Sequence, residues 1–388
     1  MQLVKPVGGQ RFASLDGLRG IACVVVVICH YLQIYVPAAF ERNFPDLFGE
    51  KWLVNSPLNL LFNGHAAVIL FFVLSGFVLS APFFRGVGWG WYARSIIKRY
   101  PRLAIPALAS SLLACGLIAI FGVRYAELNA YSGSNVTTFL PTAVDFRLAA
   151  WEGAIGSFFD GKFSYNPVLW TIRAELFGSL LVLVLVPLVG RLPAWVRYAV
   201  YAAVIWRFAN DNMVAFAFGV LASDLLLRQP RVPVVLARKW ASALVFVLGL
   251  YLLSKPYYIP YVNFWWPVDW LMPDPTMLKP HVTGAFLLIL SIASIAPMRS
   301  LLEGRTAQFL GRQSYSLYLV HFPLLGTLGA LVILPLVARV GYGWALLLAF
   351  PVVMALCLAL SVVFNRWIDE KAVAFSSWLA GALWRERR

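Results

Sequence analysis

Residues 64–83 read GHAAVILFFVLSGFVLSAPF, a run of apolar and small side chains in which His65 is the only ionisable group. Twenty such residues in a helix measure about 30 Å, the thickness of the hydrocarbon core of a bilayer. Comparable runs occupy residues 20–36, 103–121, 169–189, 240–254, 283–297, 314–337 and 344–364, with two weaker ones over 198–206 and 213–227. The sequence therefore predicts an all-α integral membrane protein with about ten transmembrane helices in one bundle.

The composition agrees with this prediction. Of the 388 residues 61% are hydrophobic and 13% charged, whereas soluble domains average about 45–50% and about 25%. These values exclude a soluble globular enzyme and a disordered chain. The four cysteines lie in apolar runs without the spacing of metal ligands, so we expect no disulfide framework and no metal site.

Basic residues predict the orientation. Ten spans place both termini on one side, and that side then carries 22 of the 32 lysines and arginines. Because positive residues mark the cytoplasm, we predict cytoplasmic termini in a multi-pass protein of the inner membrane. The division is a cytoplasmic segment 1–19, a membrane domain 20–365 and a cytoplasmic tail 366–388. The net charge of +15 then reflects orientation, and no nucleic-acid partner is expected. A cleaved signal peptide is the alternative for the first span, which lacks a clear cleavage site.

Two large loops are predicted outside the membrane, over residues 122–168 and 255–282. The second is rich in aromatic rings, including Tyr257, Trp266 and Trp270. Such rings suit the membrane interface and equally suit stacking on sugar rings. Both interpretations stay open.

Ionisable residues inside a span mark function or a buried partner. Arg19 and His30 are eleven residues apart, so they share one helix face, at about 16 Å along the axis. His30 is either a neutral structural histidine or a general base. Glu175 in the fourth span reaches the same depth, which predicts a carboxylate that orients the imidazole. Arg173 is the alternative partner of Glu175, although side chains two apart on a helix point to different faces.

The segment 91–106 is basic and contains Pro101. A proline suits the first turn of a helix, so we predict that the third span begins there with free backbone N–H groups. Arg99 and Arg102 stand beside this helix start and predict a site for a phosphate-bearing ligand. The alternative is that they only obey the positive-inside rule and meet anionic lipids.

Other polar groups receive weaker assignments. Ser75 and Gly76 lie at mid-membrane, where small residues let helices pack closely. His321 follows Ser314 on nearly the same helix face and either lines a substrate site or is structural. His65 and His281 are placed near the external surface, where structural roles are expected.

Five motifs occur in an order that resembles the acyltransferase 3 family, over residues 11–365. They are Leu15-Asp-Gly-Leu-Arg-Gly-Ile-Ala with His30, Phe72-Val-Leu-Ser-Gly-Phe, Arg99-Tyr-Pro-Arg102-Leu-x-x-Pro, Trp170-Thr-Ile-Arg-Ala-Glu175 and Ser314-Tyr-Ser-Leu-Tyr-Leu-Val-His321. The resemblance implies a membrane O-acyltransferase, commonly from acetyl-CoA, that acts on glycans or small molecules.

The resemblance also implies roles for residues. His30 and Glu175 would be catalytic, and Arg19, Arg99 and Arg102 would bind the acyl-CoA donor, which is a substrate, with no permanently bound cofactor. We assign substrate binding to Trp170, Arg173, Tyr315, His321 and Ser75. Thr171-Ile-Arg173 departs from the family's usual Ser-Leu and small residue, and Gly178 from its usual aromatic, so the acceptor pocket is expected to differ. The rival function is a transporter or flippase, since intramembrane Arg, His and Glu also form proton relays. No internal repeat supports it.

Overall fold

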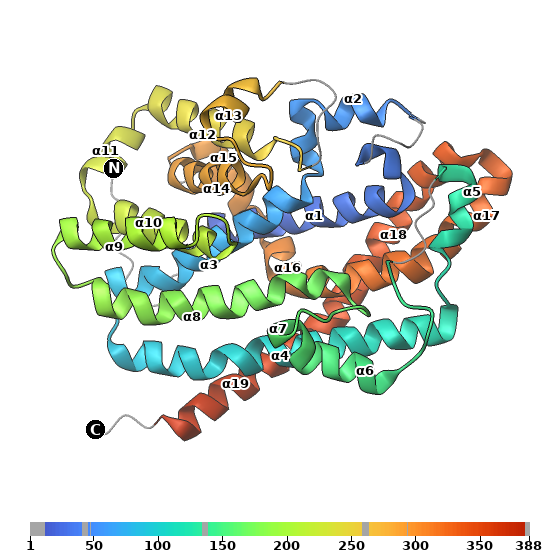
Figure 1. The fold of residues 1–388 in the computed structure, drawn as a ribbon, viewed down its shortest axis with the longest axis horizontal. Coiled ribbons are helices and arrows are strands. Elements are labelled where there is room, and N and C mark those ends of the chain that lie inside the picture. Colours follow the sequence, from blue (N-terminus) through green and yellow to red (C-terminus); the bar gives the residue numbers. More distant parts are fainter. Residues whose placement is uncertain are drawn as a thin grey trace.

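The computed structural model describes residues 12–40, 46, 48–133, 139–257, 264–292 and 294–384, and over these residues the chain forms helices and no strand (Figure 1). The outermost parts of the predicted cytoplasmic ends, residues 1–11 and 385–388, lie outside the described residues. So do residues 134–138 and 258–263 of the two predicted outer loops.

Six segments of the described chain are long and apolar enough to cross a membrane. They are Ala13–Tyr35 (α1), Gly64–Phe84 (α3), Trp89–Phe121 (α4), Pro167–Val189 (η5, Pro167–Thr171, with α8, Ile172–Val189), Arg305–Val340 (α16, Arg305–Leu324, with η6 and α17, Ala330–Val340) and Tyr342–Leu383 (α18, Tyr342–Phe364, with η7 and α19, Glu370–Leu383). A seventh span results if α14 (Leu278–Ile292) and α15 (Ala296–Glu303), bent by 96°, are one broken helix. These apolar helices are those of a multi-pass membrane protein, while the count of about ten and the sidedness of the termini stay predictions.

Three predicted spans form shorter helices. These are α9 (Ala194–Arg207), α10 (Met213–Arg228) and α12 (Lys239–Leu253). A helix of fifteen residues measures about 22 Å, which is less than the hydrocarbon core.

The remaining elements are short turns of helix. They comprise the α-helices α2 (Glu50–Val54), α5 (Asn129–Ser132), α6 (Phe146–Trp151), α7 (Ser157–Phe159), α11 (Arg231–Leu236) and α13 (Trp266–Leu271), the 3₁₀ turns η1 (Pro37–Ala39), η2 (Pro57–Leu61) and η3 (Tyr125–Leu128), and the π turns η4 (Glu152–Gly156), η6 (Leu325–Gly329) and η7 (Asn365–Asp369).

Glycines let the central helices pack backbone to backbone. A methyl group at Gly20 of α1 would lie 2.5 Å from the backbone nitrogen of Gly311 in α16. A methyl group at Gly76 of α3 would overlap the carbonyl of Phe216 in α10. The predicted packing role of Gly76 therefore agrees with the structure, and small residues serve the same purpose in other membrane bundles.

The C-terminal segment continues the last span instead of leaving it. The helix passes through the π turn η7 into α19, which packs against α4 and extends to the lower left of Figure 1. Trp367 and Trp378 are exposed on it. Most of the predicted tail 366–388 is thus helical.

Candidate active site

A cavity of about 1090 Å³ lies among α1, α3, α4, α8, α16 and the η7–α19 segment. It occupies the end of the bundle where α1, α4 and α16 begin and α3 ends. Five arginines line it, namely Arg19, Arg85, Arg99, Arg102 and Arg312. Four acidic residues also line it, namely Asp16, Glu175, Asp369 and Glu370. The chain therefore gathers nine charged side chains around a cavity whose wall is otherwise largely apolar.

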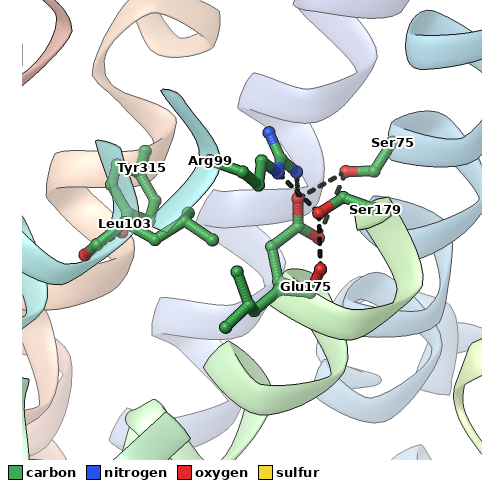
Figure 2. A network of polar contacts seen from close by, with 7 residues as sticks. Ser75, Arg99, Leu103, Glu175, Ser179 and Tyr315 are labelled. Carbon is green, nitrogen blue, oxygen red and sulfur yellow. Dashed lines mark hydrogen bonds and ion pairs between the residues drawn. The ribbon is translucent and has the colours of Figure 1, made fainter. Parts of the chain in front are cut away.

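Glu175 and Arg99 form the central ion pair of the cavity, and Figure 2 shows the network around them. The Arg99 guanidinium also donates to the Ser179 hydroxyl at 2.6 Å. Ser75 donates to the two carboxylate oxygens of Glu175 at 3.1 and 3.2 Å. The side chains of Arg99 and Glu175 are only 17% and 19% exposed, so each charge compensates the burial of the other. Ser75, which the sequence assigned to substrate binding, is thus a hydrogen-bond partner of Glu175.

Arg102 forms a second ion pair, with Asp369 in the π turn η7. The Tyr315 ring centroid lies 5.5 Å from the Arg102 guanidinium, and the Tyr315 hydroxyl donates to the Leu103 carbonyl at 3.3 Å. A guanidinium over an aromatic face is a stabilising arrangement. Arg102 and Tyr315 are therefore neighbours in one wall of the cavity.

Arg19 is held more loosely than the other two predicted donor residues. Its guanidinium lies 3.8 Å from the Asp16 carboxylate, and both side chains are about one third exposed, at 30% and 31%. Arg19, Arg99 and Arg102 line the same cavity. The three residues that the sequence assigned to the donor are therefore brought together.

The predicted helix start at Pro101 is wrong. Helix α4 begins at Trp89 and contains Pro101 in its interior, so no free N-terminal N–H groups exist beside Arg99. A proline inside a helix removes one backbone hydrogen bond, and membrane helices tolerate it because neighbouring groups satisfy the freed carbonyl. Any anion in the cavity would be bound by the arginine side chains.

His30 meets His321 instead of Glu175. His30 Nδ1 and His321 Nε2 are 2.8 Å apart, and the two rings stack with their centroids separated by 5.0 Å. The predicted pairing of His30 with Glu175 is therefore wrong in this structure, because α8 packs on α3 and α4, whereas α1 packs on α16 and α3. Equal depth along two helices did not bring their side chains together.

The hydrogen bonds of His321 define which nitrogens carry protons. His321 Nδ1 lies 3.0 Å from the Leu317 carbonyl, an acceptor only, so this nitrogen donates. In a neutral ring His321 Nε2 is then an acceptor, and His30 Nδ1 donates to it. His30 Nε2 keeps its lone pair and has no hydrogen-bond partner among the described residues. The lone pair of this nitrogen can accept a proton.

Tyr318 lies between the cavity and the histidine pair. It lines the cavity, and its ring centroid is 5.9 Å from that of His321. Its hydroxyl donates to the Val168 carbonyl at 2.9 Å and contacts Thr171 Oγ1 at 3.0 Å. The inner end of the cavity is thus one helical turn from the histidine pair.

Two predicted substrate residues lie elsewhere. Trp170 and Arg173 are exposed and are absent from the cavity wall. Arg173 is two residues from Glu175, and such side chains point to different faces of a helix. The structure adds Asp369, Ser179, Arg85 and Arg312, which the sequence did not single out.

No metal site appears in the described part of the chain, where His, Cys, Asp and Glu side chains form no group of three or more that could hold an ion. The four cysteines are free and buried or half-buried.

Comparison with known proteins identifies the family of this chain. The acyltransferase 3 family, described as an acyltransferase domain, matches residues 12–366. The chain belongs to this family. It is 26% identical over 430 residues to O-acetyltransferase PaAT-1 of Phomopsis amygdali, a match that covers 94% of this chain and 83% of that protein. It is also similar to acyltransferase clz18 of Cochliobolus lunatus and acyltransferase R4 of Phoma sp. (strain ATCC 20986 / MF5453), at 25% identity over 82% of this chain and 83% of each relative. No solved structure matches.

The family member described here is therefore an enzyme, an acyltransferase that moves groups other than aminoacyl groups. The predicted family, and with it the predicted class of enzyme, is confirmed.

Proposed function

We propose that this acyltransferase moves an acetyl group from acetyl-CoA to a hydroxyl of a glycan or related acceptor at or beyond the inner membrane. One observation carries the proposal. A cavity lined by five arginines ends one helical turn from a histidine pair that leaves a free basic nitrogen on His30.

The arginine end suits a donor that carries several phosphates. Arg99 uses Nε and one terminal nitrogen for Ser179 and Glu175, and Arg102 uses one terminal nitrogen for Asp369. A guanidinium has five N–H donors, so both side chains retain donors for phosphate oxygens. Arg19 adds a third guanidinium. We infer that the donor enters from the cytoplasm, because this end of the bundle holds the N-terminal ends of α1, α4 and α16, the predicted cytoplasmic side.

The chemistry needs one base. His30 Nε2 would take the proton of the acceptor hydroxyl while its oxygen attacks the thioester carbonyl carbon. The carbon–sulfur bond breaks, the ester forms, and the proton passes to the thiolate of coenzyme A. A covalent route, in which His30 Nε2 attacks the carbonyl first, uses the same atom.

His321 would act as a positioning residue in either route. It accepts the Nδ1 proton of His30 and so leaves Nε2 as the ring nitrogen that carries the lone pair. The positive charge that His30 gains in the reaction remains hydrogen-bonded to His321.

The test is thiol release by the purified protein from acetyl-CoA with candidate acceptors, alcohols and glycosides among them. We expect release that depends on the acceptor and appears with an acetyl ester in the product. The matched control is His30→Ala, which should retain donor binding. Equal thiol release by this variant would refute the proposed role of His30, and the absence of transfer from acetyl-CoA to every alcohol and glycoside would refute the proposed reaction.

A further inference from the structure

The chain has four histidines, and all four form pairs of the same kind. The second pair joins the start of α3 to α14. His65 Nδ1 and His281 Nδ1 are 2.7 Å apart, and His281 Nε2 lies 2.8 Å from the Lys255 carbonyl. This arrangement resembles that of His30, His321 and Leu317, with the two ring nitrogens of the central histidine exchanged. The Asn63 amide nitrogen also lies 3.4 Å from His281 Nε2.

The Lys255 carbonyl determines which nitrogens of His65 and His281 donate hydrogen bonds. The oxygen of Lys255 can only accept, so His281 Nε2 donates to it. With both rings neutral, His281 Nδ1 accepts from His65 Nδ1. His65 Nε2 then carries a lone pair, and it has no hydrogen-bond partner among the described residues. His281 is completely buried, whereas His65 is half-buried.

The ring of Tyr257 lies beside the ring of His65. The Tyr257 ring centroid lies 4.5 Å from that of His65, with the planes tilted by 30°. Tyr257 is 44% exposed. A hydrogen-bond acceptor beside an exposed aromatic face can receive a hydroxyl and the apolar face of a ring on the same molecule.

The two histidine pairs lie on neighbouring helices. A methyl group at Gly64 would lie 2.7 Å from the Cys29 sulfur, so the residue before His65 touches the residue before His30. Both pairs therefore lie near the end of the bundle opposite the arginines.

The charges near this histidine pair are of both signs. Burial alone would raise the pKa of the Asp274 carboxyl, but the backbone N–H groups of Lys279 and Thr276 and the Thr276 hydroxyl outweigh it and lower the pKa below its ordinary value. Asp274 is thus ionised at neutral pH, and its negative charge acts on both His65 and His281, whereas the Lys255 ammonium, which pairs with Asp269, acts on His281 in the opposite sense. Charges of both signs thus face the pair, so they do not select an anionic ligand.

We propose that His65, positioned by His281, and Tyr257 form a binding site for the acceptor, a neutral ring that carries hydroxyl groups. The identification of this ligand as the acceptor rests on the proposed function, but its binding does not. The site would hold the acceptor near the end of the bundle opposite the arginines.

The experiment uses chemical modification, which needs no catalysis. The protein is purified in a detergent without a sugar headgroup, and the His30→Ala variant is used so that His65 is the one half-buried histidine left. Carbethoxylation with diethyl pyrocarbonate is followed at His65 by mass spectrometry. We expect methyl glucoside to slow the modification in a saturable way, and n-butanol at the same concentration to have no effect.

Variants sharpen this result. Tyr257→Leu should raise the methyl glucoside concentration needed for half protection about three- to tenfold, and Tyr257→Phe should leave it nearly unchanged. No modification of His65, no protection by the glucoside, or equal protection by butanol would each overturn the proposal. If protection occurs and the wild-type protein transfers no acyl group, the site stands and the proposed reaction fails.

Discussion

The Glu175 carboxylate is paired with the Arg99 guanidinium across the interface of α8 and α4, in the wall of the arginine-lined cavity. Glu175 therefore lies at the arginine end of the molecule, where we propose that the donor binds, and His321 is the hydrogen-bond partner of His30, the proposed base. The Arg99–Glu175 ion pair and the His30–His321 pair share no residue, so variants of one pair should leave the other pair intact.

Breaking this ion pair should destabilise the protein. We expect Arg99→Met to lower the free energy of unfolding by about 3 kcal/mol, because it leaves the Glu175 charge without its main partner in a buried position. The double variant Arg99→Met with Glu175→Met should recover most of this loss in thermal unfolding in detergent. If it is no more stable than the single variant, the pair does not compensate the buried charges.

The histidine pair should behave as one unit in catalysis. His30→Ala should lower turnover about a hundredfold to ten-thousandfold, and His321→Leu should cost no more. The double variant should add little to His30→Ala. His321→Gln, whose amide oxygen can accept from His30 Nδ1, should be clearly more active than His321→Leu. Independent, multiplicative losses would separate the two histidines.

Arg102 should bind the phosphates of the donor through two nitrogens of its planar guanidinium. Arg102→Lys should raise the KM for acetyl-CoA with little change in expression, because an ammonium cannot bind phosphate in two places. Lys98→Ala, on the same helix but absent from the cavity wall, is the control. A KM for acetyl-CoA that is unchanged in both Arg99→Ala and Arg102→Ala would show that these arginines do not bind the donor and only follow the positive-inside rule.

The contact between α3 and α10 should not accept a side chain. Gly76→Ala should destabilise the protein by about 1–3 kcal/mol, since its methyl group would overlap the Phe216 carbonyl. Gly116→Ala in α4 is the matched control, because a methyl group there would meet nothing within 4 Å. Equal thermal stability of the two variants would show that the helices can separate at no cost.

Orientation can be tested with single cysteines. Cysteines at Gly88 and Ser300 should be protected from impermeant thiol reagents in intact cells, and one at Thr142 should be labelled. All three positions are exposed, and the four native cysteines are buried or half-buried. Labelling at Gly88 without labelling at Thr142 would reverse the predicted topology and the side from which the donor enters.

The sequence was informative where the signal is local. Apolar length located the long helices α1, α3, α4 and α8, and the motif around Arg99 and Arg102 located one wall of the cavity. Apolar residues are also frequent in α9, α10 and α12, but an apolar composition does not determine whether a helix reaches the length of a span.

Side-chain partners across helices could not be predicted in the same way. His30 and His321 are separated by 291 residues, and the depth argument matched His30 equally well with Glu175. Depth fixes one coordinate of a side chain, whereas its partner depends on which helices are neighbours and how each is rotated. Asp369 carried no signal of its own, because an acidic residue after the last apolar run is expected at any membrane surface.

The π turn at Asn365–Asp369 sets the rotation of α19 about its own axis, and so determines which of its side chains face α4. A π turn is an α-helix with one residue inserted, and each residue in a regular helix corresponds to about 100° of rotation. Deleting one residue between Asn365 and Asp369 would therefore turn every later side chain by roughly that angle. The buried face of α19, which carries Ala372, Ser376 and Ala380, would then be turned away from α4 by that angle, so the packing of α19 on α4 depends on the length of this short segment.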